Sequence, residues 1–276
     1  MKKQTILLTG ASRGIGAQLV ERLAYLGYDL VLVARNEEAL SKRAESIKTK
    51  YPQVQITILA CDLSQRTSLD QLLVGLDTLE IDIVIHNAGV DAFQTFESSD
   101  LGDLERNLYL NLTAPILITR KLISKWLIKN EGLVISMSSL AGLFPTPFGS
   151  HYSASKSGLW AFTQALGIEY AHTNLKFVSI HPGFVNGDGM HEAHKQIAGS
   201  APIFLGGTTT QDVIKTIEKA LTSKKPDALY VANRFSIKPL LMLTHLLPNL
   251  GRWLGSKLMK NYLSKIAHHS EDQHKQ

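Results

Sequence analysis

Two residues that could move a proton stand four positions apart in the middle of the chain. Tyr152 and Lys156 lie in the segment HYSASKSGLWAF, and Ser139 precedes Tyr152 by thirteen residues. Positions i and i+4 of a helix share one face, so we expect the phenol and the ammonium side by side. A nearby ammonium lowers the pKa of a phenol from its usual value near 10. The spacing predicts a tyrosine that acts as acid or base.

A glycine-rich segment near the start of the chain predicts a cradle for a dinucleotide. Three glycines lie within TGASRGIG, directly after a short apolar run. Glycine allows a tight turn and lets the backbone approach a pyrophosphate closely. The helix that we expect to begin near Gly14 would point unpaired N–H groups at this anion. The loop residues that we assign to the cofactor are Gly10, Ser12, Arg13, Gly14, Ile15 and Gly16.

Apolar runs alternate with helical patterns along most of the chain, which indicates an α/β fold. We expect strands at residues 4–9, 29–33, 54–60, 81–86, 132–138, 175–181 and 228–232. We expect helices near residues 14–27, 37–51, 65–79, 101–129, 152–172 and 209–222. Strands that alternate with helices of this length favour a parallel sheet covered on both faces. The prediction is a single Rossmann-type, doubly wound sheet of about seven strands in the order 3-2-1-4-5-6-7, with the cofactor across the carboxyl ends of the strands.

Taken together, the motifs resemble the short-chain dehydrogenase/reductase family over residues 4 to about 232. The motifs are TGxxxGxG, NAG at residues 87–89, Ser139 and YxxxK. The resemblance implies hydride transfer between C4 of a nicotinamide and a carbonyl carbon or secondary alcohol, with Tyr152 moving the proton. It also implies that Asn111, in YLNLTAP, completes a tetrad with Ser139, Tyr152 and Lys156 and holds a water that links Lys156 to solvent. We prefer Ser139 to Ser138 because of its spacing to Tyr152 and the LAG that follows it.

The same resemblance implies further contacts with the cofactor. Asp62 and Leu63 would meet the adenine ring, and Lys156 would bridge the nicotinamide ribose hydroxyls. The remaining residues assigned in this way are Asn87, Ala88, Gly89, Tyr152, Pro182, Gly183 and Val185. We assign no metal site.

Two positions depart from the family pattern. His86 stands where the family often has a second asparagine, and we interpret it as a structural hydrogen bonder at a strand end. Gly187 replaces the threonine of PGxVxT, which in the family meets the nicotinamide carboxamide. Val185 is kept, and Asn186 is a candidate to replace the missing contact.

The end of the second strand favours NADP(H) over NAD(H). NAD-selective sites usually carry an acid there, but LVLVARNEEAL places Ala34 and Arg35 at this point. Arg35 and Arg13 together would supply guanidinium groups for a 2′-phosphate, with Ser12 and Asn36 as further donors. The alternative is that Arg35 is a solvated loop residue.

Aromatic and apolar residues flank the expected reaction centre and favour an apolar substrate, which we describe as lipid-, steroid- or ketone-like. They are Phe144, Pro145, Phe148, Phe184 and Met190. With Ser139 and Tyr152 they form the predicted substrate site, and ordinary core packing is the alternative. Residues 187–207 are rich in glycine and lie where the family has a mobile lid.

The net charge of +5 belongs to the end of the chain. Residues 234–276 carry seven basic and two acidic side chains, which leaves 22 of each sign in residues 1–233. The catalytic domain, residues 1–233, therefore has no excess of positive charge for nucleic acid. We interpret residues 234–276 as a basic helical extension of the same domain, and the end beyond His268 as disordered.

A helical stripe in this extension leaves three alternatives open. It comprises Leu247, Leu250, Leu254, Leu258, Tyr262 and Ile266. The stripe could cover the substrate pocket, pack against another subunit, or lie on an anionic membrane as a peripheral contact. We favour packing, because Lys265 falls on the stripe.

Composition gives weaker indications of compartment and assembly. The chain has one cysteine, Cys61, which excludes an intrachain disulfide and agrees with a reducing compartment. No window reaches the roughly 18–20 apolar residues of a membrane span, so we expect a cytoplasmic protein. The resemblance implies a homodimer or homotetramer built through helices near residues 103–129 and 152–172. The alternative function is a non-catalytic NADP(H)-binding regulator or scaffold, which the complete tetrad disfavours.

Overall fold

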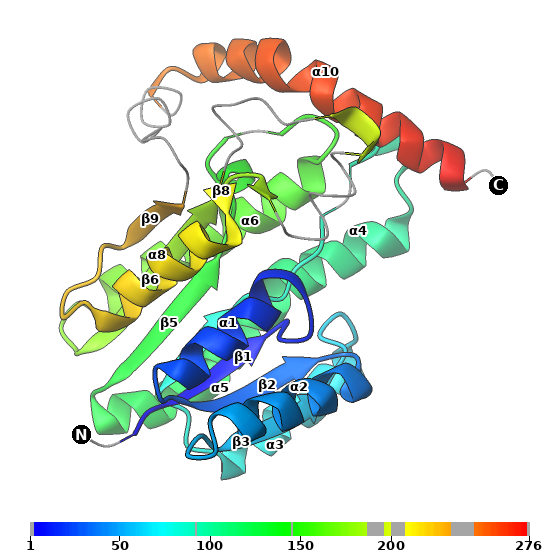
Figure 1. The fold of residues 1–276 in the computed structure, drawn as a ribbon. Helices are drawn as coiled ribbons and strands as arrows, with labels where there is room; N and C mark the ends of the chain where they lie inside the picture. Colours follow the sequence, from blue (N-terminus) through cyan, green and yellow to red (C-terminus); the bar gives the residue numbers. More distant parts are fainter. Residues whose placement is uncertain are drawn as a thin grey trace.

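A seven-stranded parallel sheet forms the centre of the molecule (Figure 1). The computed structural model describes residues 3–91, 93–144, 146–186, 196–199, 208–232 and 246–274. The strands are β1 Thr5–Thr9, β2 Asp29–Ala34, β3 Ile56–Ala60, β4 Ile83–His86, β5 Gly132–Met137, β6 Leu175–Pro182 and β9 Leu229–Ala232. Their order is β3-β2-β1-β4-β5-β6-β9, which confirms the predicted doubly wound order with β9 as the seventh strand. The order reverses between β1 and β4, where such sheets bind their ligands.

Helices cover both faces of this sheet. They are α1 Gly14–Tyr25, α2 Glu37–Lys50, α3 Arg66–Gly75, α4 Leu101–Leu108, α5 Ala114–Lys129, α6 Ser150–Glu169, α8 Thr210–Thr222 and α10 Pro248–His274. Short helical turns add η1 Leu76–Thr78, η2 Phe96–Ser98, η3 Tyr109–Thr113 and η4 Leu140–Gly142. Buried side chains of α1, α2 and α8 pack on one face, and those of α3 and α5 pack on the other.

Alternation along the central strands divides the core in two. Ile6 and Leu8 of β1 join the cluster beneath α1, whereas Leu7 between them joins the cluster beneath α5. Successive side chains of a strand point to opposite faces, so a strand buried on both sides is apolar throughout. This is why the short apolar runs were recognisable as strands.

The segment predicted as one helix over residues 101–129 is interrupted. A π-helical turn, η3, separates α4 from α5. Pro115, in the first turn of α5, has no N–H to donate to the carbonyl four residues earlier, which is that of Asn111. Turns of this kind are frequent at functional sites, and this one carries a predicted tetrad residue.

The C-terminal extension forms a long helix that lies across the carboxyl ends of β5 and β6 (Figure 1). Its inward side chains are buried in one apolar cluster with residues near the ends of β4 and β5. From α10 the cluster includes Met259, Tyr262, Leu263 and Ile266, and from the rest of the chain Phe93, Leu140, Leu143 and Phe144. Tyr262 and Ile266 of the predicted stripe are buried, but Leu247 is 51% exposed. The side chains of Leu254 and Leu258 lie outside the described part. The expected disorder beyond His268 was wrong, because α10 continues to His274.

Two further features complete the description. A two-stranded parallel sheet, β7 Val185–Asn186 with β8 Thr208–Thr209, was not predicted. Across the residues that the structure describes, no helix is both long and apolar enough to cross a bilayer.

His86 ends β4 and is buried between the sheet and α5. Its side chain is 1% exposed, and Nε2 lies 2.8 Å from the Thr119 hydroxyl, as expected for a structural hydrogen bonder. Burial lowers the pKa of His86 to about 3 because an imidazolium would lose its hydration there.

This burial predicts a specific loss of stability in acid. The folded pKa lies below the unfolded value of about 6.5, so the unfolded chain takes up a proton that the folded chain refuses. The contribution of His86 is therefore complete above about pH 6.5 and decreases as pH falls toward 3. Between pH 7 and pH 5 the free energy of unfolding should decrease by about 2 kcal/mol because of His86. Urea unfolding at pH 7 and pH 5 should show a smaller loss for His86→Asn than for the unchanged protein. His268→Asn, an exposed control on α10, should keep the full loss. Equal losses in all three proteins would contradict the assignment.

Candidate active site

The glycine loop between β1 and α1 is built for close approach of a ligand to the backbone. Gly10 and Gly14 have φ values of 69° and 56°, in the left-handed region that favours glycine. A Cβ on Gly16 would lie 2.0 Å from the Gly10 carbonyl oxygen. Arg13 precedes α1 in an extended conformation without a side-chain cap, and the first turn contains no acid. The first N–H groups of α1 are thus available to an anion.

The loop forms one wall of an open hollow at the switch point of the sheet. The predicted residues that line it are Gly10, Ser12, Arg13, Gly14, Ile15, Gly16, Arg35, Asp62, Leu63, Asn87, Ala88 and Gly89. Every cofactor residue predicted from the first four strands is therefore brought to one place. The residues present fit a dinucleotide, because the glycines leave the backbone uncovered by side chains where a pyrophosphate would lie.

Side chains at the ends of β1 and β4 hold this hollow open. The Thr9 hydroxyl accepts from the N–H groups of Asn87 and Ala88, each at 3.0 Å. Asn87 Nδ2 donates to the carbonyls of Thr9 and Gly10 at 3.1 and 3.2 Å. Asn87 thus links the glycine loop to the end of β4. From the sequence Asn87 was assigned to the cofactor, but this link was not predicted.

The end of the hollow next to β2 is basic. Arg13 and Arg35 both line it and are exposed. Asn36 lines it too, but its Oδ1 caps α2 by accepting from Ala39 N–H at 2.8 Å. Glu38, in the first turn of α2, pairs with Lys42 at 2.6 Å. Among the described residues that line the hollow, Asp62 is the acid, and its Oδ1 accepts from Ser64.

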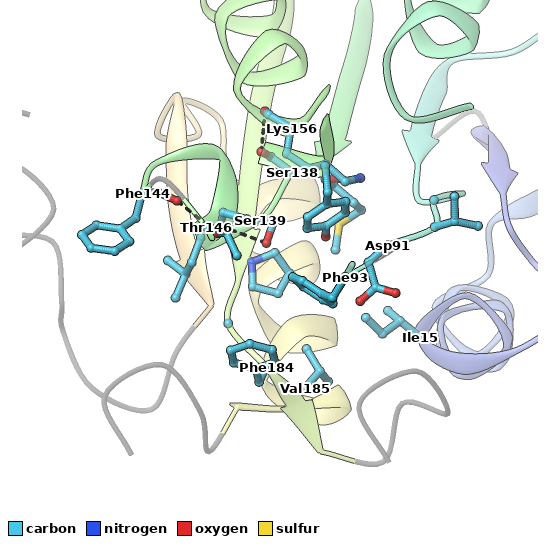
Figure 2. Close-up of a pocket in the computed structure, with 18 of the residues that line it drawn as sticks. Ile15, Asp91, Phe93, Ser138, Ser139, Phe144, Thr146, Lys156, Phe184 and Val185 are labelled. Carbon is cyan, nitrogen blue, oxygen red and sulfur yellow. Dashed lines mark hydrogen bonds between the residues drawn. The ribbon is translucent and has the colours of Figure 1, made fainter. Parts of the chain in front are cut away.

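A second hollow adjoins the first and contains the predicted proton-transfer residues (Figure 2). Ile15, Asn87, Gly89 and Val90 line both hollows, so the two lie side by side. Tyr152, Lys156 and Ser139 line the second, together with the predicted cofactor residues Pro182, Gly183 and Val185. Helix α6 begins at Ser150, which places Tyr152 and Lys156 one turn apart on the face that looks into the hollow.

Lys156 is the buried charge of this site. Its side chain is 4% exposed, and Nζ donates to the Met137 carbonyl at 2.9 Å. Nζ also lies 5.8 Å from the centre of the Tyr152 ring, where a positive charge favours the phenolate. Burial lowers the pKa of Lys156 to about 8, and the nearby charge of Asp91 acts in the opposite direction.

The two neighbouring serines have different roles. The Ser138 hydroxyl donates to the Lys156 carbonyl at 2.9 Å and is buried. The Ser139 hydroxyl accepts from Ala141 N–H at 3.1 Å and keeps its own proton for another acceptor. This arrangement agrees with the preference for Ser139.

His181 was missed by the sequence reasoning although it precedes the assigned Pro182. It is fully buried in β6, with Nδ1 3.0 Å from the Ser139 carbonyl and Nε2 2.8 Å from the Ser179 hydroxyl. Burial lowers its pKa to about 4, so it is neutral at ordinary pH. A neutral imidazole with both nitrogens engaged holds the main chain of Ser139 in place.

Asn111 lies in the π-helical turn and is fully buried. Its Oδ1 accepts from Val90 N–H at 3.0 Å, and its Nδ2 donates to the Val90 carbonyl at 2.8 Å. Nδ2 also lies 3.1 Å from Asn107 Oδ1 and 3.2 Å from Ser155 Oγ. A Cβ on Gly89 would lie 3.1 Å from Asn111 Oδ1 and 3.2 Å from Lys156 Nζ, so these polar groups meet at one point.

The walls of the second hollow are largely apolar, as predicted, but their members differ in part. Phe144 and Phe184 line it, whereas Phe148 packs on the adjacent cluster and is not among the lining residues. Pro145, Gly187 and Met190 lie outside the described residues. Lining residues that the sequence reasoning missed include Asp91, Phe93, Thr146 and Met259. Their positions depend on loops and on α10, for which the sequence carries no local signal.

Fold and site together define a nucleotide-binding oxidoreductase with a tyrosine-lysine pair. Residues 4–198 match the family described as short chain dehydrogenase. The chain belongs to this family, whose members bind a nicotinamide cofactor.

Two curated relatives are similar over most of their length. The ketoacyl reductase HetN of Nostoc sp. is 31% identical over 234 residues, covering 83% of this chain and 79% of the relative. The 3-oxoacyl acyl-carrier-protein reductase FabG of Rickettsia prowazekii is 31% identical over 185 residues, covering 67% of this chain and 74% of the relative.

Solved structures share the fold at lower identity. A short-chain dehydrogenase from Sphingobium yanoikuyae in complex with NADPH has a TM-score of 0.78 at 23% identity, covering 90% of this chain and 94% of that one. A 4-hydroxyisoleucine dehydrogenase complexed with NADH and succinate has a TM-score of 0.71 at 23% identity, covering 83% of this chain and 97% of that one. Likeness of fold therefore does not select between the two cofactors.

Proposed function

We propose that the protein is an NADP(H)-dependent oxidoreductase that interconverts a carbonyl and a secondary alcohol on an apolar, lipid-, steroid- or ketone-like substrate. The observation that carries this proposal is that the two hollows adjoin. Tyr152, Lys156 and Ser139 line an apolar hollow that shares four of its lining residues with the glycine cradle.

The proposed roles follow from the positions of the side chains. The bound nicotinamide would supply or accept the hydride at its C4 carbon. Ser139 would donate a hydrogen bond to the substrate oxygen and so orient the carbonyl. Tyr152 would give its proton to that oxygen in reduction and remove it in oxidation. Lys156, held by the Met137 carbonyl, would stabilise the phenolate through its charge and bind the nicotinamide ribose.

Tyr152→Phe tests the catalytic role directly. The phenylalanine keeps the ring but removes the transferable proton, so kcat for a reduced ketone should fall by at least about a hundredfold. NADPH affinity, measured by quenching of tryptophan fluorescence, should change by less than about threefold, because the ring is retained. Tyr25→Phe makes the same change at an exposed tyrosine of α1 and is the control that leaves the hollow intact. Full turnover by Tyr152→Phe would show that Tyr152 does not carry the proton transfer, whereas tight NADPH binding without turnover of any carbonyl by the unchanged protein would favour the alternative of a non-catalytic NADP(H)-binding regulator or scaffold.

The apolar character of the substrate is supported by the walls and by the relatives. Phe93, Phe144, Phe184 and Met259 surround the reaction centre, and aromatic walls bury large apolar areas. HetN is named a ketoacyl reductase, which makes acyl ketones the first substrates to assay.

The preference for NADP(H) is supported by charge at the β2 end of the cradle. Arg13 and Arg35 line this end, and the nearby Glu38 is paired with Lys42. Guanidinium groups bind phosphate through paired, charge-assisted hydrogen bonds.

Arg35→Asp should reverse this preference. An aspartate repels the 2′-phosphate and can accept from a ribose hydroxyl, so the ratio of kcat/KM for NADPH to that for NADH should fall by more than about tenfold. Lys48→Asp makes the same change of charge at an exposed position of α2 outside the cradle and should leave the ratio unchanged. An unchanged ratio in Arg35→Asp would show that Arg35 is a solvated loop residue.

Assembly and compartment are part of the same proposal. Ile128 of α5 and Ile168 of α6 are 87% and 80% exposed, which supports a homodimer or homotetramer through these helices. Cys61 is buried, and burial raises the pKa of its thiol, in agreement with a reduced thiol in the cytoplasm.

We propose that α10 covers the substrate hollow and that peripheral membrane contact is the lesser alternative. The inner side of α10 is buried against the pocket walls. Leu247, which directly precedes α10, and Trp253 on α10 are exposed, and Lys257 Nζ lies 5.1 Å from the centre of the Trp253 ring, a combination also found in helices that bind anionic membranes.

Vesicle binding distinguishes these alternatives. We expect no co-sedimentation of the full chain with phosphatidylglycerol vesicles above its level with phosphatidylcholine vesicles, because most of the apolar side of α10 is buried. The variant Leu247→Ser with Trp253→Ser should behave identically. Binding to the anionic vesicles that this variant loses would establish the membrane contact instead.

A further inference from the structure

We propose that Asp91 is a positioning residue whose carboxylate is the counter-charge that keeps the Lys156 ammonium charged during turnover. The inference rests on the proposed function and adds to it a residue outside the tetrad. Asp91 follows the NAG motif by one residue, and the sequence reasoning assigned it no role.

The main chain beside Asp91 is fixed by the tetrad itself. Val90 is held through both its N–H and its carbonyl by Asn111, at 3.0 and 2.8 Å, and its carbonyl also accepts from Asn107 at 3.2 Å. Asp91 therefore directly follows a residue whose N–H and carbonyl are both hydrogen-bonded.

The same segment touches Lys156. A Cβ on Gly89 would lie 3.2 Å from Lys156 Nζ. Consecutive Cα atoms are about 3.8 Å apart, so the Cα of Asp91 is within about 7.6 Å of that of Gly89. Asp91, Tyr152 and Lys156 all line the second hollow, where Figure 2 shows the carboxylate of Asp91 near Ile15 and Phe93. The carboxylate and the ammonium thus share a largely apolar enclosure, in which charges interact more strongly than in water.

Lys156 needs such a charge because its direct partner is neutral. The Met137 carbonyl accepts a hydrogen bond but cannot offset the lost hydration of a buried ammonium. Burial lowers the pKa of Lys156 to about 8, and Asp91 is the charge that raises it. Without Asp91, a larger fraction of Lys156 would be neutral at the pH of turnover.

The other groups that face Lys156 do not replace Asp91. Tyr152 lies one turn earlier on α6, and its phenolate is the group that the ammonium is proposed to stabilise. His181 faces Lys156 from β6 and is neutral, because burial lowers its pKa to about 4. Asn111, from η3, carries no charge. Asp91 is the acid among the described residues that line this hollow.

The test compares Asp91→Asn with variants that separate charge from structure. Asp91→Glu restores the carboxylate, and Asp91→Ser removes it with a smaller side chain if the asparagine does not fit. Asp77→Asn removes one negative charge from an exposed surface pair with Lys121 and is the matched control. Circular dichroism melting establishes that each variant is folded.

The first readout is the pH profile of kcat/KM for reduction of a neutral ketone with NADPH. Loss of the carboxylate favours the neutral amine, so the alkaline limb should move to lower pH by about half a unit or more in Asp91→Asn and Asp91→Ser. Asp91→Glu should return the limb toward its original position, and Asp77→Asn should leave it unchanged. A lower rate at every pH with an unmoved limb would overturn the proposal, because that is the effect of a structural role.

The second readout does not require turnover. The ¹³Cε chemical shift of Lys156, identified by its loss in Lys156→Met, reports the ammonium directly as pH is raised. Its midpoint should be lower in Asp91→Asn than in the unchanged protein, and the same midpoint in both would overturn the proposal. If the unchanged protein reduces no carbonyl, the proposed function fails, whereas this titration still decides the role of Asp91.

Discussion

A buried lysine is the constraint on which the site depends. An ammonium that is 4% exposed has given up nearly all its water, and the surrounding structure must replace what it has lost. The Met137 carbonyl supplies one hydrogen bond at the carboxyl end of β5. The main chain of Lys156 is held as well, because its carbonyl accepts from Ser138 and a Cβ on Gly142 would collide with that carbonyl at 2.8 Å. The start of α6 is thus pressed against the loop that carries Ser139.

Asparagine side chains connect this helix to the cofactor side of the sheet. Asn111 binds both polar groups of the Val90 peptide, and the π-helical turn around Asn111 is where regular α-helical bonding is interrupted. Asn87 ties the end of β4 to the glycine loop. The segment from Asn87 to Asp91 therefore has one end fixed to the dinucleotide cradle and the other beside Lys156. This segment is therefore a wall that the two hollows share.

The C-terminal helix contributes to the apolar wall of the second hollow. Met259 lines the hollow, and Leu263 and Ile266 are buried behind it with Phe93 and Phe144. Apolar walls lower the local dielectric, which strengthens electrostatic interactions inside the hollow. Packing of the helix on this wall also accounts for the burial of Tyr262, which the stripe predicted without indicating its partner.

The sequence alone determined the order of the sheet, the glycine loop and the pairing of Tyr152 with Lys156. The loop and the pairing follow from local rules, because i and i+4 share a helix face and glycine tolerates the left-handed turns of the loop. The order of the sheet follows from the alternation of strands with helices, which is typical of the doubly wound fold. Tertiary structure decided where Asp91 and His181 lie, because Asp91 lines the same hollow as Lys156 and His181 lies 3.0 Å from the Ser139 carbonyl, although each pair is distant in the chain. It also placed α10 over the hollow, excluded Phe148 from its lining, and interrupted the helix at Asn111. No periodicity encodes these contacts, because they arise when elements separated in sequence pack together and each side chain takes the space that its neighbours leave.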